Sequence, residues 1–179
     1  MAATEYVRRH DNALKILAVE WGKKEGLLVE KTVWYKERWG KGHVMENNGK
    51  KILWDWEHRM RTHCTARRPD LTLEDEIKKE IYIVDMACPG ERNKEAKRNE
   101  KIAKYQQLCY EIRERRQNFK VKVIPVVIGC CGGGIKEMKS AIKELFDEKT
   151  TNKLANEMQK TVLWESETII RKVVSGLIE

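Results

Sequence analysis

Hydrophobic and polar residues follow two kinds of spacing along this chain, and together they predict a mixed α/β protein. Apolar positions recur at helical spacing over residues 6–24 and in three later segments. Short β-branched or aromatic runs lie between these segments and predict strands. The predicted helices cover residues 6–24, 92–117, 135–147 and 153–174, and the predicted strands cover residues 51–56, 71–73, 81–85 and 121–128.

The order of these elements is α-β-β-β-α-β followed by two helices, which predicts helices packed on the faces of a mixed sheet. We expect residues 1–179 to form a single domain with a core over about residues 5–130, to which the two C-terminal helices are added. Residues 25–49 are expected to be irregular. Pro125 lies within the last predicted strand and lacks a backbone N–H, so that strand requires an edge position or a bulge.

The two central strands are expected to form a β-hairpin with its turn centred near Ile77 and Lys78. This centre places Asp70 opposite Asp85, and directly opposed residues have Cβ atoms roughly 4.5–5.5 Å apart. Two carboxylates at that separation repel each other unless a proton or a cation lies between them. The pair is therefore a candidate site for a divalent cation that faces a phosphate.

The charge of the chain supports a polyanionic partner. The sequence has 36 Lys and Arg residues against 28 Asp and Glu residues, a net charge of +8. Eleven basic and five acidic residues lie between positions 91 and 122, and four arginines lie with one glutamate between positions 57 and 68. These segments flank the aspartate hairpin, as expected for a nucleic-acid-binding face. The alternative is a solvated helix surface with i,i+4 ion pairs.

Two further features limit the class of protein. No apolar run approaches the roughly 20 residues that a membrane-spanning helix needs, so we expect no membrane partner. The five cysteines lack the spacing of a disulfide framework, which is typical of a reducing, intracellular environment.

The aspartates and the element order resemble the restriction-like nucleases of the PD-(D/E)xK type. In that family an Asp after Pro and an acid on the next strand hold a metal ion, and a Lys two residues further on assists the attacking water. Pro69-Asp70 and Asp85 match this pattern, whereas Ala87 stands where the Lys is expected.

The following helix offers a replacement lysine. At about 100° per residue, Lys101 lies roughly 30–40° from the centre of the apolar stripe, whereas Lys104 lies about 90° away, toward solvent. A long lysine side chain in this position can reach over the sheet. The alternative is an ordinary lysine that extends to solvent from the edge of a core.

Three motifs narrow the resemblance to the C-terminal restriction-like endonuclease of non-LTR retrotransposons: Arg68-Pro69-Asp70, the acid Asp85, and Lys101-x-x-Lys104-Tyr105. Residues 9–15, 85–89 and 125–129 are also similar to segments of these elements. In the family a reverse transcriptase and a zinc knuckle precede this domain, and neither motif occurs in the sequence.

The resemblance implies a metal-dependent DNA endonuclease or nickase that cuts target DNA to prime reverse transcription in the nucleus. It implies Mg²⁺ or Mn²⁺ bound by Asp70, Asp85 and the carbonyl of Met86, with Lys101 as the catalytic lysine. Glu20 on the first helix either adds a carboxylate or is an ordinary surface residue. Duplex DNA is the implied partner, and the element's RNA is a second candidate. The residues expected to contact the DNA backbone are Arg67, Arg68, Lys97, Arg98 and Lys104.

Two other classes of function remain open. A decayed nuclease fold that binds nucleic acid without catalysis is supported by Ala87. A protein-interaction domain would use Trp34, Tyr35, Trp39 and the last helix as its docking surface. The aspartate pair argues against this second class, because such a pair has no structural role beside a basic helix.

Overall fold

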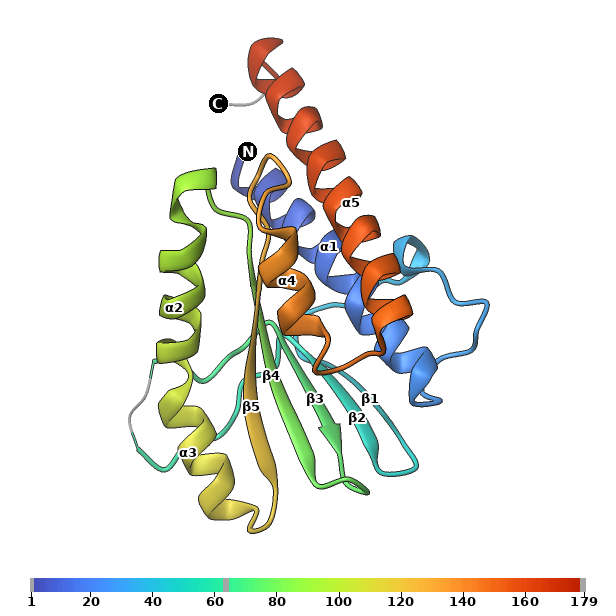
Figure 1. Cartoon of the computed structure of the whole chain (residues 1–179), viewed down its shortest axis with the longest axis vertical. Helices are drawn as coiled ribbons and strands as arrows, with labels where there is room; N and C mark the ends of the chain where they lie inside the picture. The colour runs from blue at the N-terminus through green and yellow to red at the C-terminus, as the bar shows by residue number, and fades with distance from the viewer. Residues whose placement is uncertain (1, 63–64, 178–179) are drawn as a thin grey trace.

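Five strands form one mixed sheet in the computed structural model, which describes residues 2–62 and 65–177 (Figure 1). The strands follow the order β1-β2-β3-β4-β5 across the sheet. The pairs β1–β2, β2–β3 and β3–β4 are antiparallel, and β5 runs parallel to β4. Their bounds are β1 (His43–Asn47), β2 (Lys50–Trp54), β3 (Leu71–Asp75), β4 (Glu80–Ala87) and β5 (Lys120–Val127).

Helices cover both faces of this sheet (Figure 1). One layer contains α1 (Ala2–Lys24), α4 (Ile135–Ile142) and α5 (Glu148–Val174), and the other contains α2 (Lys94–Lys104) and α3 (Gln106–Arg115). Two short 3₁₀ helices, η1 (Trp34–Lys36) and η2 (Glu91–Asn93), lie in connecting loops. Within the described residues, no helix combines the length and the apolar character needed to cross a membrane.

The alternation of side chains along β4 assigns its residues to the two layers. Val84 and Met86 are buried in the core shared with α1, α4 and α5, whereas Ile81 and Ile83 are buried against α3. Successive strand residues point to opposite faces. Asp85 therefore points to the face covered by α2 and α3, where Lys101 and Lys104 of α2 lie close to it.

The mixed α/β architecture predicted from the sequence is confirmed, with one additional strand. Residues 25–49, expected to be irregular, contain β1, which pairs with β2 across the turn Asn48-Gly49. Both turn residues have positive φ, 47° and 72°. Asn-Gly is the preferred sequence for such a two-residue hairpin turn, so this signal was present in the sequence. Pro125 lies in the edge strand β5, as predicted.

The single helix predicted over residues 92–117 is wrong, because the chain divides there into α2 and α3. The break falls at Tyr105, whose φ and ψ are −102° and 9°. Tyr105 is fully buried, and its hydroxyl donates a hydrogen bond to Asp85 at 2.6 Å and lies 3.3 Å from the carbonyl oxygen of Arg68. The break between α2 and α3 therefore accompanies the contact of the Tyr105 side chain with Asp85 of β4.

Candidate active site

The hairpin between β3 and β4 has the register that the sequence predicts. Leu71 pairs with Val84, so Asp70 lies opposite Asp85 one step beyond the ladder. The turn is held by Asp75, whose Oδ1 accepts hydrogen bonds from the backbone N–H groups of Ile77 and Lys78. The turn thus fixes the position of the two aspartates at the far end of the hairpin.

A third aspartate, which the sequence analysis missed, continues this row. Trp54 pairs with Leu71 in the next ladder, which places Asp55 opposite Asp70. The backbone N–H of Asp55 donates to the carbonyl of Asp70 at 2.8 Å. Asp55, Asp70 and Asp85 are spaced fifteen residues apart, and this repeated interval was the available signal. The Asp55 carboxylate pairs with Arg68.

Asp85 is the most buried carboxylate of this row, with 1% of its surface exposed. Its Oδ1 accepts the Tyr105 hydroxyl, and its Oδ2 forms an ion pair with Lys101. The geometry of the Lys101 contact is that of an ion pair and not of a hydrogen bond. Asp85 Oδ2 is therefore a buried carboxylate oxygen that accepts no hydrogen bond within the described residues. Burial and the neighbouring Asp85 raise the pKa of Tyr105, which therefore stays a neutral donor.

Lys101 reaches the aspartate site from α2, as the helical wheel predicts, with 15% of its side chain exposed. Lys104 does not point away into solvent as expected. Its Nζ lies 3.8 Å from Asp85 Oδ1 and 4.6 Å from the centre of the Tyr105 ring, with 39% of the side chain exposed. The reason is the helix break at Tyr105, since Lys104 ends α2 and lies directly above the ring.

Asp70 is held by a histidine that the sequence analysis did not predict. Its Oδ2 accepts hydrogen bonds from the backbone N–H of Met86 at 2.7 Å and from His10 Nε2 at 3.0 Å. Burial alone would raise the pKa of Asp70, but the hydrogen bond and charge of His10, together with the Met86 amide and Lys101, lower it.

His10 is charged at neutral pH because two carboxylates face its ring. Nδ1 lies 2.9 Å from Asp11 Oδ1, and Nε2 contacts Asp70. Burial disfavours the imidazolium, but the hydrogen bonds with Asp11 and Asp70 outweigh it and raise the pKa to about 10. Each central aspartate therefore has its own cation, His10 on Asp70 and Lys101 on Asp85, which relieves their mutual repulsion.

The donor atoms of this site fit a divalent cation such as Mg²⁺ or Mn²⁺. Carboxylate and carbonyl oxygens are the ligands such ions prefer. Asp85 Oδ2 accepts no hydrogen bond, although Lys101 pairs with it, and both hydrogen bonds to Asp70 use Oδ2, which leaves its Oδ1 for a cation. The N–H of Met86 faces Asp70, and the carbonyl of the same strand residue points to the same side.

Glu20 does not belong to this cluster. It lies ten residues after His10, about 15 Å further along α1. Its carboxylate pairs with Lys153 at 3.3 Å and with Lys23 at 3.9 Å, so it links α1 to α5. Glu20 is therefore an ordinary residue of the helix surface, which was the alternative left open by the sequence.

The five basic residues expected to contact DNA lie before Asp70 or on α2. Four lie within ion-pair distance of a carboxylate: Arg67 of Glu57, Arg68 of Asp55, Lys97 of Glu100, and Lys104 of Asp85. Arg98 differs, because its Nε is buried without a hydrogen-bond partner among the described residues. It lines a cavity of about 550 Å³ between α2 and α4.

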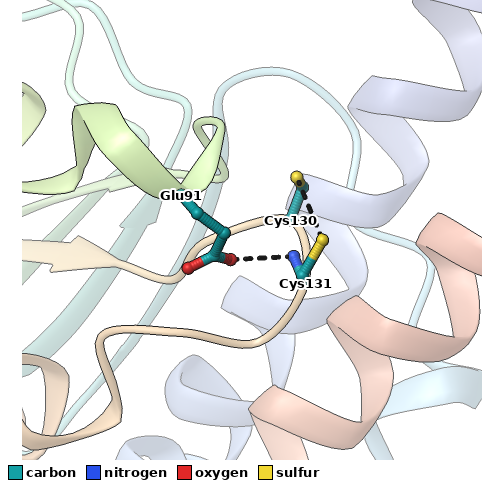
Figure 2. Close-up of side chains that lie close together, drawn as sticks. All are labelled: Glu91, Cys130 and Cys131. Atoms are coloured by element: carbon teal, nitrogen blue, oxygen red, sulfur yellow. Dashed lines mark hydrogen bonds between the residues drawn. The ribbon is translucent and has the colours of Figure 1, made fainter.

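A separate group of metal-ligand types lies in the loops after β4 and β5 (Figure 2). One carboxylate oxygen of Glu91 and the Sγ atoms of Cys130 and Cys131 lie within 4.8 Å of one another. The Glu91 carboxylate already accepts the N–H groups of Cys131 and Gly133, at 3.0 and 3.3 Å, and pairs with Lys94. The Glu91 carboxylate therefore joins the two loops, because it accepts backbone N–H groups of the glycine-rich turn in the way that a bound anion would.

The sequence of this chain matches no protein-family model, and a search of curated proteins finds no match either. The assignment of a function therefore depends on the chemistry of the aspartate site.

Proposed function

We propose that this chain is a divalent-metal-dependent DNA endonuclease or nickase domain with a restriction-like core, similar to the nuclease of non-LTR retrotransposons. The observation that carries the proposal is the position of Asp70 opposite Asp85, with Lys101 of the following helix against Asp85. The parallel pairing of β4 and β5, across the α2–α3 connection, supports a core of the same kind. Lys101 takes the place of the lysine missing at Ala87.

The residues of the site have distinct roles in this proposal. Asp70, Asp85 and the carbonyl of Met86 would hold Mg²⁺ or Mn²⁺. When bound, the cation would polarise the scissile phosphate and lower the pKa of a bound water. Lys101 orients that water or stabilises the charge that develops on the phosphate. Tyr105 fixes the orientation of Asp85, and His10 fixes that of Asp70.

The proposed substrate is duplex DNA in the nucleus, and the element's RNA is a second candidate partner. Among the proposed backbone contacts, Arg98 has no ion pair within the described residues, and Lys104 lies 3.8 Å from Asp85 with 39% of its side chain exposed. Arg67, Arg68 and Lys97 contribute once their ion pairs open. Cleavage would supply the 3′-OH that primes reverse transcription.

A nucleic-acid-binding module without catalysis is the second candidate function. Ala87 and the closed state of Asp85, which has Lys101 and Tyr105 on its two oxygens, favour it. The two candidates share the basic face and differ only in cleavage.

Nicking of supercoiled plasmid with Mg²⁺ or Mn²⁺ separates the two candidates. The wild-type chain should nick weakly, and EDTA should stop the reaction. Asp70→Asn or Asp85→Asn should reduce nicking below detection. Circular dichroism should show that both variants keep the fold. Glu20→Gln is the matched control, since it removes a carboxylate on α1 outside the site and should leave nicking unchanged. A wild-type chain that binds DNA but never nicks it establishes the second candidate.

The two lysines of α2 provide a sharper test of the catalytic assignment. Lys101→Ala should abolish nicking and leave DNA affinity within a few-fold, because one phosphate contact at most is lost. Lys104→Ala should weaken binding and retain nicking, since Lys104 is further from Asp85 and more exposed. Loss of nicking in Lys104→Ala alone would contradict the assignment.

A further inference from the structure

An open groove of about 700 Å³ lies on the opposite side of α1 from the aspartate site. It is formed where α1 and α5 pack side by side and the light-blue turn of η1 lies next to α5 (Figure 1). Arg8 and Asn12 of α1 line the groove, whereas His10, between them in sequence, contacts Asp70. The groove is thus a separate surface that shares one helix with the site.

Aromatic side chains form one element of this groove. Trp164 of α5 is 70% exposed and Tyr35 of η1 is 59% exposed. Trp34 also lines the groove and is fixed by a hydrogen bond from Nε1 to Glu157 at 2.8 Å. Trp34 and Tyr35 meet edge to face, with ring centres 5.7 Å apart. A tryptophan this exposed buries little of its own surface, so its face is free to stack on a planar ligand.

Unpaired cations form the second element. Four basic side chains line the groove, and three of them have no carboxylate partner within the described residues: Lys15, Arg38 and Lys160. The fourth, Arg8, pairs with Glu165, which also accepts a hydrogen bond from Asn12 at 2.8 Å. Glu165 is the one acidic residue among the lining residues, and it is buried. Arg8 also pairs with Glu5 outside the lining, so the excess of positive charge in the groove comes from Lys15, Arg38 and Lys160.

We propose that this groove binds a single-stranded segment of nucleic acid. Exposed aromatic faces that stack on bases, next to cations that follow the phosphates, are the features by which proteins bind single strands without sequence preference. A duplex offers no unstacked base to Trp164 or Tyr35, so the groove discriminates against it. An acidic peptide would satisfy the cations but would leave the aromatic faces without a partner. The proposal does not depend on cleavage at Asp70 and Asp85.

Fluorescence anisotropy of labelled oligonucleotides tests this proposal on the whole chain. Oligothymidylate and oligouridylate of about a dozen nucleotides, within the size range of known single-strand sites, should both bind and should quench tryptophan fluorescence. Trp164→Ala should weaken this binding about tenfold, since stacking contributes roughly 1–3 kcal/mol per base. Lys160→Ala should weaken it and reduce its salt dependence by about one phosphate contact.

Controls separate stacking from general attraction to polyanions. Ile170→Ala removes another exposed apolar side chain from α5, 62% exposed and outside the groove, and should leave oligonucleotide affinity unchanged. Trp164→Ala should also leave nicking and duplex binding unchanged, so the outcome is independent of the aspartate site. Equal binding of heparin and oligonucleotide, unaffected by Trp164→Ala, would overturn the proposal. So would a wild-type chain that binds an acidic polypeptide but no single strand.

Discussion

At the scale of single residues, the main feature is that each catalytic candidate is already neutralised by its own cation. Lys101 pairs with Asp85 and His10 pairs with Asp70. The aspartates therefore do not destabilise the fold by mutual repulsion. Removal of Asp85 would leave Lys101 and the Tyr105 hydroxyl without their partner in a buried position, which costs stability. Conservative Asp→Asn changes keep the shape of the site and suit functional tests better than alanine.

The titration of His10 provides the first prediction. Its pKa in the folded chain is about 10, above the ordinary value of 6.5, so the folded state binds the extra proton over this range. The stabilisation that His10 provides is therefore complete below pH 6.5 and is lost as the pH rises toward 10. Melting temperatures should fall over this range, and the fall should be smaller in His10→Gln. In NMR spectra the His10 ring should titrate near pH 10.

His58 serves as the internal control for this titration, because it is shifted in the opposite direction. Burial lowers its pKa to about 4, and Nε2 lies 2.9 Å from the Thr72 hydroxyl. Its contribution is present above pH 6.5 and is lost as the pH falls toward 4. A His10 ring that titrates near pH 6.5 would contradict the proposed charged state of the site.

At the scale of elements, the sequence predicted what depends on local pattern. The β3–β4 hairpin followed from β-branched runs on either side of a turn, and its register placed Asp70 opposite Asp85. The Asn48-Gly49 hairpin could also have been predicted, since its turn signal is local. β1 contains only two apolar residues, Val44 and Met45, and charged residues lie close to them in sequence, so no alternating apolar pattern marks this strand.

The parts of the site that could not be predicted depend on contacts distant in sequence. His10 meets Asp70 across sixty residues, and no spacing rule connects them. The break between α2 and α3 is similar, because residues 92–117 have a continuous helical pattern. The hydrogen bond from Tyr105 to the buried Asp85 accompanies the break, and it forms only when the helix packs on the sheet. Tertiary contacts thus outweigh local propensity at these positions.

The glycine turn after β5 provides a prediction at this scale. A Cβ on Gly133 would overlap the Glu91 carboxylate and displace it from the turn. We expect Gly133→Ala to cost about 1–2 kcal/mol through the lost hydrogen bonds, or a few degrees in melting temperature. Gly40→Ala is the matched control, because a Cβ there meets nothing within 4 Å. In a Glu91→Ala background the Gly133 change should cost less, and full additivity would exclude this coupling.

At the scale of the whole molecule, the net charge of +8 does not show which basic residues can contact a partner, because many of them are already held in ion pairs. Several basic residues of the two basic segments are held in ion pairs, including Arg67, Arg68, Lys97 and Arg116. Three basic residues of the groove between α1 and α5 lack such partners within the described residues: Lys15, Arg38 and Lys160. Charge counted from sequence therefore overstates the attraction at the aspartate face and misses the groove, since pairing depends on the fold.

The salt dependence of duplex binding measures how many of these pairs open. Five phosphate contacts, from Arg67, Arg68, Lys97, Arg98 and Lys104, would give a slope of about −4.5 in log K against log[salt], or a loss of roughly 500-fold between 50 and 200 mM salt. If Arg67, Arg68 and Lys97 stay in their ion pairs, only the contacts from Arg98 and Lys104 remain and the slope is about −1.8. We expect the steeper slope, because exposed ion pairs contribute roughly 0–1 kcal/mol and open readily for a phosphate.

Lys97→Ala tests this expectation at a single contact, since Lys97 pairs with the exposed Glu100 on α2. It should reduce the slope by about 0.9. Lys120→Ala is the control, because Lys120 is exposed and begins β5 opposite Glu80, about 16 Å along the sheet from Asp85. It should leave the slope unchanged. Equal effects of the two substitutions would mean that the chain attracts DNA through its net charge alone, and a flat response to salt would exclude a phosphate-binding face around the aspartates.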